Sequence, residues 1–383
     1  MKPWRRIKLR DVLALDLHKE SVDASKRYEM VGVLSFGKGL FDRDPIDAGK
    51  TSYKYFLRLE AEHIVMSQLF GWEGALALSS NKFAGKYVSP QFPTFVCDED
   101  QIDRYFLGWA IRRPGFWKDL SSRAKGMGDR RRTLNPEALF ESETVLPSIS
   151  EQHDIVNHLN ALAERTQQLE AHLDAVERNA EQLLRSHIFQ TANLGSLLRP
   201  MSDFLSQRQT DVAVSRTEQY RFAGVYSFGR GVFASAVKVG SEFAYERLST
   251  VRAGDFIYPK LMAWEGALGI VPQECDGMVV SPEFPVFSIN TRLVLPEVLD
   301  IYFRTPDVWP ELASISGGTN VRRRRLQPSA FLNYKMPVPS MATQLRLRGL
   351  HQHVRALKAK HAAIRLSNAA LLPATLERVF VPA

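Results

Sequence analysis

The sequence predicts an α+β fold in which two mixed α/β domains alternate with two long helices. The helices are expected to pair as an antiparallel coiled coil, with a pseudo-twofold relation between the two halves. Three observations support this: the chain is duplicated, each copy begins with a segment rich in β-formers, glycine and proline, and each copy ends in heptads. A chain of 383 residues, 45% of them hydrophobic, has room for two or three domains with ordinary cores.

The duplication covers almost the whole length with one constant offset of 192 residues. SFGKG at Ser35–Gly39 recurs as SFGRG at Ser227–Gly231. WEGAL at Trp72–Leu76 recurs unchanged at Trp264–Leu268, and VSPQFPTF recurs as VSPEFPVF. A constant offset excludes a net insertion between these blocks and indicates duplication of a complete folding unit. The period is too long for a solenoid repeat, so each copy is expected to contain a domain.

The change of composition within each copy predicts four segments. Residues 1–147 and 193–339 are expected to form the two mixed domains, and residues 148–192 and 340–383 the two helices. Within the domains, β-forming runs bounded by turn residues predict strands at Glu29–Leu34, Arg221–Tyr226, Asp255–Pro259, Ala267–Val271 and Phe284–Ile289. Short helical patterns occupy Ile102–Ile111 and Pro296–Phe303.

The first long helix follows Pro147 and contains neither proline nor glycine as far as Gln190. Ser148 and Glu151 form a capping box at its start. Forty residues would extend about 60 Å at about 1.5 Å per residue. One apolar stripe recurs every seven residues, and a less regular one consists of Leu159, Thr166, Leu173 and Ala180. The regular stripe, expected to form the coiled-coil and partner-docking face, consists of Ile155, Leu162, Leu169, Val176 and Leu183.

The second long helix has a comparable apolar stripe, which stops before Pro373. Its first turn reads Ala342-Thr343-Gln344, without the glutamate of the first capping box. Each helix is the expected partner of the other, and antiparallel pairing would put the two domains at opposite ends. The stripe contains Leu347, Leu350, Val354, Leu357, Ile364 and Leu371.

The net charge of +8, with a pI near 9.4, favours a polyanionic partner such as double-stranded DNA. An arginine run follows a glycine-containing approach at the same point of both copies and is closed by Leu-x-Pro. Such a loop suits contact with a phosphate backbone; a solvated charged turn is the alternative. The candidates in these loops are Lys125, Arg130, Arg131 and Arg132 in the first copy, and Thr319, Asn320, Arg322, Arg323, Arg324 and Arg325 in the second.

Two further features recur in both copies as DNA-contact candidates. Lys38 and Arg230 lie in the SFGKG and SFGRG turns, where they could contact a DNA backbone. The pairs Trp72-Glu73 and Trp264-Glu265 are identical between copies. One interpretation is a core tryptophan beside a glutamate that fixes a turn. The other is a glutamate that accepts from cytosine N4, or that supports a base-reading arginine.

The two copies differ at positions that could distinguish bases. Gln68 corresponds to Lys260, and Thr133 corresponds to Arg325. A glutamine can pair bidentately with adenine, whereas a cation favours the acceptors of guanine. We therefore expect the two domains to read related but unequal half-sites.

The sequence lacks the residues that nucleotide binding, methyl transfer, nuclease activity or metal binding would require. Ala48-Gly49-Lys50-Thr51 resembles the end of a P-loop, but Asp44 stands where the first glycine is needed. There is no methyltransferase catalytic tetrad and no nuclease-like acidic cluster, and the histidines do not recur with metal-ligand spacing. We therefore expect no catalytic residues, no metal and no cofactor bound by this chain. Two unmatched cysteines, Cys97 and Cys275, and no apolar span indicate a cytoplasmic protein without membrane contact.

Taken together, these features resemble the DNA-specificity subunit of type I restriction–modification enzymes. The resemblance covers essentially the whole chain and depends on the repeated blocks, the arginine runs and the exit Leu146–Gln152, which is close to the family's helix start. It implies two target-recognition domains, one for each half of a split DNA target. It also implies that the two helices dock methyltransferase subunits, and that the complex contains two such subunits. S-adenosylmethionine would be bound by those partners, and a restriction or translocase subunit could join them.

Two other classes of function remain open at the level of sequence. A coiled-coil scaffold whose two domains bind proteins would show no salt-sensitive binding to duplex DNA. A domain descended from a fused restriction–methylation enzyme would be active without added subunits, and the missing catalytic motifs disfavour it.

Overall fold

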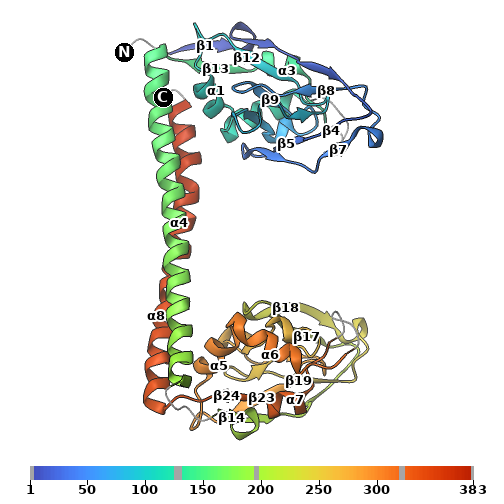
Figure 1. The fold of residues 1–383 in the computed structure, drawn as a ribbon, viewed down its shortest axis with the longest axis vertical. Coiled ribbons are helices and arrows are strands. Elements are labelled where there is room, and N and C mark those ends of the chain that lie inside the picture. The colour runs from blue at the N-terminus through green and yellow to red at the C-terminus, as the bar shows by residue number, and fades with distance from the viewer. Residues whose placement is uncertain (1–3, 125–131, 194–197, 319–323, 381–383) are drawn as a thin grey trace. The chain divides into compact units, whose positions relative to one another are not determined.

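The computed structural model describes residues 4–124, 132–193, 198–318 and 324–380. They form two compact units, one of residues 1–171 with 363–383 and the other of residues 172–362. Each unit combines one α+β domain with parts of the two long helices, α4 (Ile149–Asn193) and α8 (Met341–Phe380). The predicted alternation of mixed domains and long helices is confirmed (Figure 1). No helix in the described ranges is long and apolar enough to cross a membrane.

The first domain is built from short strands and three short helices. A four-stranded antiparallel sheet has the order β10-β9-β12-β2, and a three-stranded sheet the order β11-β8-β3. The helices are α1 (Arg104–Ala110), α2 (Pro114–Arg123) and α3 (Pro136–Phe140). The strands are β1 (Arg5–Lys8), β2 (Leu13–Leu15), β3 (Lys19–Ser21), β4 (Arg27–Tyr28), β5 (Val31–Leu34), β6 (Gly39–Asp42), β7 (Ile46–Asp47), β8 (Tyr55–Arg58), β9 (Ile64–Met66), β10 (Leu76–Leu78), β11 (Tyr87–Val88), β12 (Thr94–Cys97) and β13 (Glu143–Leu146).

The second domain repeats this topology. Its four-stranded sheet, β15-β23-β20-β21, consists of the equivalents of β2, β12, β9 and β10 in the same order. The hairpin β17–β18 is longer than its counterpart β5–β6 and joins a five-stranded sheet. The helices are α5 (Pro296–Phe303), α6 (Trp309–Ser314) and α7 (Pro328–Asn333). The strands are β14 (Leu198–Pro200), β15 (Leu205–Gln207), β16 (Val212–Ala213), β17 (Gln219–Tyr226), β18 (Gly231–Val239), β19 (Arg247–Thr250), β20 (Phe256–Ile257), β21 (Gly269–Ile270), β22 (Val279–Val280), β23 (Val286–Ile289) and β24 (Lys335–Pro337).

A buried glutamine at the start of each long helix ties the helix to its domain. The Gln152 amide nitrogen donates to the carbonyls of Pro147 and Gln101, and its oxygen accepts from the amide of Asp103. Gln344 repeats all three bonds with Pro339, Leu293 and Leu295. Both side chains are buried. The predicted capping box is present between Ser148 and Glu151, whereas α8 keeps only its serine half, in which Ser340 Oγ accepts from the amide of Thr343.

The two helices pair antiparallel within each unit, and Leu159 and Leu173 of the second predicted stripe are buried. In the first unit Asn368 bonds to the Thr166 carbonyl and the Glu170 carboxylate, and in the second His361 contacts Glu177 at 2.8 Å. Leu169, Leu183 and Ile364 are exposed. Ile155 and Leu350 pack against the domain cores, and Leu162, Val176 and Leu357 are half-buried. The buried apolar side chains among the described residues of α4 are Val156, Leu159, Leu173, Leu184 and Ile188.

The contacts between the two helices are partly polar. Glu170, Glu177 and Glu181 of α4 meet Arg365, His361 and Lys358 of α8. An apolar stripe alone therefore does not describe this pairing.

The apolar stripe of the second helix stops before Pro373, but α8 continues through this proline to Phe380. Proline inside a helix removes one hydrogen bond and costs about 3 kcal/mol. Beyond it, Leu376 and Phe380 are buried in the first domain's core. Glu377 accepts from the amide of Gly115 at 2.7 Å, and Arg113 donates to the Phe380 carbonyl. Burial of two large apolar side chains outweighs the proline's cost.

Candidate nucleic-acid interface

Each arginine loop returns to its domain at the same anchored leucine. The Leu134 amide donates to the Gln68 carbonyl at 2.7 Å, and the Leu326 amide donates to the Lys260 carbonyl at 2.8 Å. Both leucines are fully buried. The predicted return to a packed framework is therefore present in both copies, and it places the end of each loop beside residue 68 or 260.

The Trp-Glu pairs form short 3₁₀ turns next to these anchors, η3 (Gly71–Glu73) and η6 (Ala263–Glu265). The Glu73 carboxylate accepts from the Ser35 hydroxyl at 3.2 Å, and Glu265 accepts from Ser227 at 3.3 Å. This is the turn-fixing arrangement, one of the two interpretations that the sequence left open. Each tryptophan donates its ring N–H to a backbone carbonyl three residues earlier.

In the first unit three candidates come together, and we call Gln68, Trp72 and Arg132 the first-unit cluster. The Arg132 guanidinium lies 5.6 Å from the centre of the Trp72 ring, a cation–π distance. Trp72 is half-buried, as are Gln68 and Arg132. The cluster therefore holds one arginine against an aromatic ring, and the Gln68 backbone carbonyl accepts from the amide of Leu134, two residues after that arginine.

In the second unit Arg324 is half-buried, and the Lys260 amide donates to the Glu283 carbonyl at 2.9 Å. Arg325 forms an ion pair with Glu283, with 2.6 Å between Nη1 and Oε2, at the base of its loop. The equivalents of Arg325 and Glu283 are Thr133 and Gln91. The difference between Thr133 and Arg325 is thus matched by a difference between Gln91 and Glu283. Sequence reasoning missed this pairing, although VSPQF and VSPEF differ visibly at that position.

The SFGKG and SFGRG turns lie beside the long helices. Phe36 and Phe228 have left-handed backbone conformations, with φ of 64° and 63°, and both side chains are exposed. Lys38 and Trp117 border a cavity whose other wall contains Arg365 and Asn368 of α8. Arg230 likewise borders a cavity with α4 and α8 in the second unit. The structure therefore places Lys38 and Arg230 at the helix pair.

The remaining candidates lie outside the described residues. They are Lys125, Arg130, Arg131, Thr319, Asn320, Arg322 and Arg323. Their contacts with DNA stay predictions.

Among the described residues one group has the geometry to hold a metal ion. Asp16, His18 and His63 bring their ligand atoms within 4.8 Å of one another. His63 lies 2.9 Å from the Asp16 carboxylate, and its other ring nitrogen faces the Ala61 carbonyl. These contacts hold the pKa of Asp16 below its usual value, the His63 hydrogen bond most strongly. The second domain has an ion pair between Arg208 and Asp255 at the equivalent positions. This place in the fold therefore has a polar side-chain contact in both domains.

Comparison with known proteins identifies the fold. No protein-family model and no curated protein sequence matches the chain. The HsdS subunit from Thermoanaerobacter tengcongensis is similar over 99% of this chain and 97% of its own, with 16% identity and a TM-score of 0.55. A chain from a structure of complex assembly and conformational transition of the type I R-M system is similar over the same shares, with 15% identity and a TM-score of 0.68. The resemblance predicted from the sequence is confirmed as a shared fold.

Proposed function

We propose that this chain is the DNA-specificity subunit of a type I restriction–modification complex. Each domain would read one half of a bipartite duplex target, and the helix pair would dock methyltransferase subunits. The observation that carries the proposal is the duplicated arginine loop, anchored identically at Leu134 and Leu326, within a fold that matches such subunits over nearly its whole length. Arginines beside a half-buried tryptophan supply phosphate contact and a stacking surface.

The chemistry of the complex would belong to its partners. S-adenosylmethionine would be bound by the methyltransferase subunits, two of which we expect, and a restriction subunit could join them. The chain itself would contribute affinity through its basic loops and specificity through side chains such as Gln68 and Lys260. It would act in the cytoplasm on double-stranded DNA.

The direct test is to assemble the chain with the methyltransferase encoded beside it and to map methylated sites in cells with and without the chain. We expect methylation at one split sequence that disappears without the chain. Methylation at the same sites in both strains would contradict the proposal. Activity of the chain without added subunits would favour a fused enzyme instead.

The salt dependence of DNA binding distinguishes the proposal from a protein-binding scaffold. We expect Arg324→Ala/Arg325→Ala to weaken duplex binding and to reduce the slope of log K against log salt by about one to two units. Arg216→Ala/Arg292→Ala removes the same net charge from exposed positions of the same domain and serves as the control. Equal slopes in the two double variants would show that the loop does not contact phosphates. Binding without any salt dependence would favour the scaffold.

A further inference from the structure

Arg112, which follows α1, has a half-buried guanidinium without a carboxylate partner among the described residues. Its Nε donates to the Gly37 carbonyl at 3.1 Å, and its guanidinium carbon lies 4.5 Å from the centre of the Trp109 ring. Burial lowers the pKa of Arg112. Among the described residues this half-buried cation contacts a carbonyl and an aromatic ring, and neither contact supplies a compensating charge.

In the second domain the charge of the equivalent arginine is neutralised by a carboxylate. Arg304, the equivalent of Arg112, pairs with the Asp300 carboxylate, with 2.9 Å between Nε and Oδ1. His351 of α8 lies 3.1 Å from the other oxygen. In the first domain Gly108 stands in place of Asp300, and Leu159 stands in place of His351. The first domain has therefore kept the cation and lost the whole anionic side chain.

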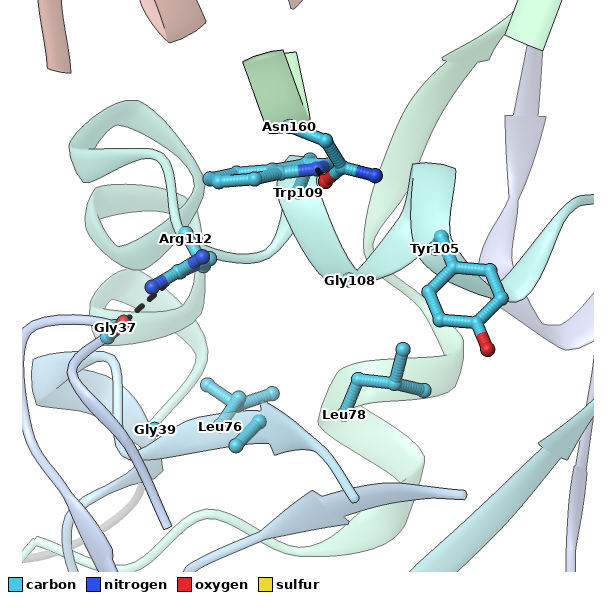
Figure 2. Close-up of a pocket in the computed structure, with 10 residues that line it drawn as sticks. Gly37, Gly39, Leu76, Leu78, Tyr105, Gly108, Trp109, Arg112 and Asn160 are labelled. Carbon is cyan, nitrogen blue, oxygen red and sulfur yellow. Dashed lines mark hydrogen bonds between the residues drawn. The ribbon is translucent and has the colours of Figure 1, made fainter. Parts of the chain in front are cut away.

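A cavity of about 250 Å³ lies where that side chain would be. Figure 2 shows Arg112, Trp109 and Asn160 on one side of it and Leu76 and Leu78 on the other. Gly108 and Tyr105 complete the wall. Asn160 Oδ1 accepts from the Trp109 ring N–H at 3.0 Å, which fixes that ring beside the guanidinium. The cavity thus combines one cation with both polar and apolar wall atoms, the apolar part coming from Leu76, Ala77 and Leu78.

We propose that this cavity binds a small carboxylate anion against Arg112, in the place that Asp300 occupies in the second domain. An aspartate side chain differs from that of glycine by a methylene carboxylate, which is close to an acetate ion in size and charge. A guanidinium binds a planar carboxylate bidentately. Leu76, Ala77 and Leu78 offer apolar contact to a short aliphatic tail. A dianionic phosphate would leave its second charge unpaired in this cavity, so we expect it to bind at least tenfold more weakly.

The test uses the full chain and trifluoroacetate followed by ¹⁹F NMR, with unlabelled acetate as competitor and chloride at equal ionic strength as control. We expect saturable line broadening that acetate reverses and chloride does not. Gly108→Asp should weaken this binding at least tenfold, because it restores the internal partner. A Cβ at Gly108 would lie 3.3 Å from Leu78, which borders the cavity and has room to shift.

Two further variants keep the inference testable if Gly108→Asp does not fold. Arg112→Gln leaves the cavity without its cation and should also weaken binding at least tenfold. Asp300→Gly recreates the cavity in the second domain and should add a second site, with a thermal midpoint that rises with acetate and not with chloride. Equal broadening in the parent chain and in Arg112→Gln, or the absence of saturable broadening in the parent chain, would overturn the proposal.

Discussion

The Asp300 carboxylate is enclosed between Arg304 of its own domain and His351 of α8. Burial alone would raise the pKa of this group. The hydrogen bond from His351 and the charge of Arg304 outweigh that effect, and the pKa of Asp300 lies below its ordinary value. A single ionised side chain thus joins a domain to the helix that follows it in sequence.

We expect Asp300→Asn to lower the free energy of unfolding by about 1 kcal/mol at pH 7, because it removes the buried carboxylate that pairs with the part-exposed Arg304 and with His351. A group with a depressed folded pKa stabilises the fold above its unfolded pKa, which is about 3.9 for aspartate. The deficit should therefore shrink as the pH falls below about 4. Urea unfolding at several pH values measures it, and a deficit independent of pH would contradict the charge argument.

Arg325 and Glu283 form the second residue-scale feature, an ion pair at the base of a loop that we propose binds DNA. We expect Glu283→Gln to increase DNA affinity severalfold, because it frees Arg325 and removes a negative charge near the phosphates. Gln91→Glu in the first domain is the matched reverse change and should weaken binding. Titration with the same duplex measures both. Equal DNA affinities of Glu283→Gln and Gln91→Glu would show that these two positions face away from DNA.

At the scale of elements, each long helix depends on one buried glutamine at its start. We expect Gln152→Ala and Gln344→Ala each to cost about 3 kcal/mol, because each leaves one amide and two carbonyls without partners in a buried site. Gln168→Ala, at an exposed position of α4, is the control and should change stability by less than about 0.5 kcal/mol. Thermal unfolding compares the three. A control as destabilised as the others would mean that the loss reflects helix propensity.

The proline within α8 provides a second test at this scale. Pro373 is exposed and follows Leu372, which packs against the first domain's core. We expect Pro373→Ala to raise the free energy of unfolding by about 1–3 kcal/mol, because it restores a helical hydrogen bond. Calorimetry measures the shift. A lower midpoint would instead indicate that the docking of Leu376 and Phe380 requires the helix to bend at the proline.

At the scale of the whole molecule, the proposed function makes the paired helices set the spacing between two half-sites. Inserting one heptad into α4 near Ala171 and one into α8 near Ala363 keeps the antiparallel partners matched. Seven residues add about 10 Å, or about three base pairs. We expect methylated sites with the same half-sites and a longer spacer. An unchanged spacer in a folded variant would contradict this role.

The sequence alone determined the features that depend on order and local pattern. The constant offset established the duplication, and the absence of proline and glycine placed α4. The repeat also predicted the shared topology, since equivalent strands take the same order in both four-stranded sheets.

Only the tertiary structure decided which partner each side chain meets, and equivalent positions of the two domains have different partners. The polar contacts between the two helices, the burial beyond Pro373, the partner of Arg325 and the cavity at Gly108 each depend on a contact between segments far apart in the chain. Periodicity describes one element at a time. It cannot say which partner meets a side chain, and that partner decides whether a charge is neutralised or a proline is tolerated.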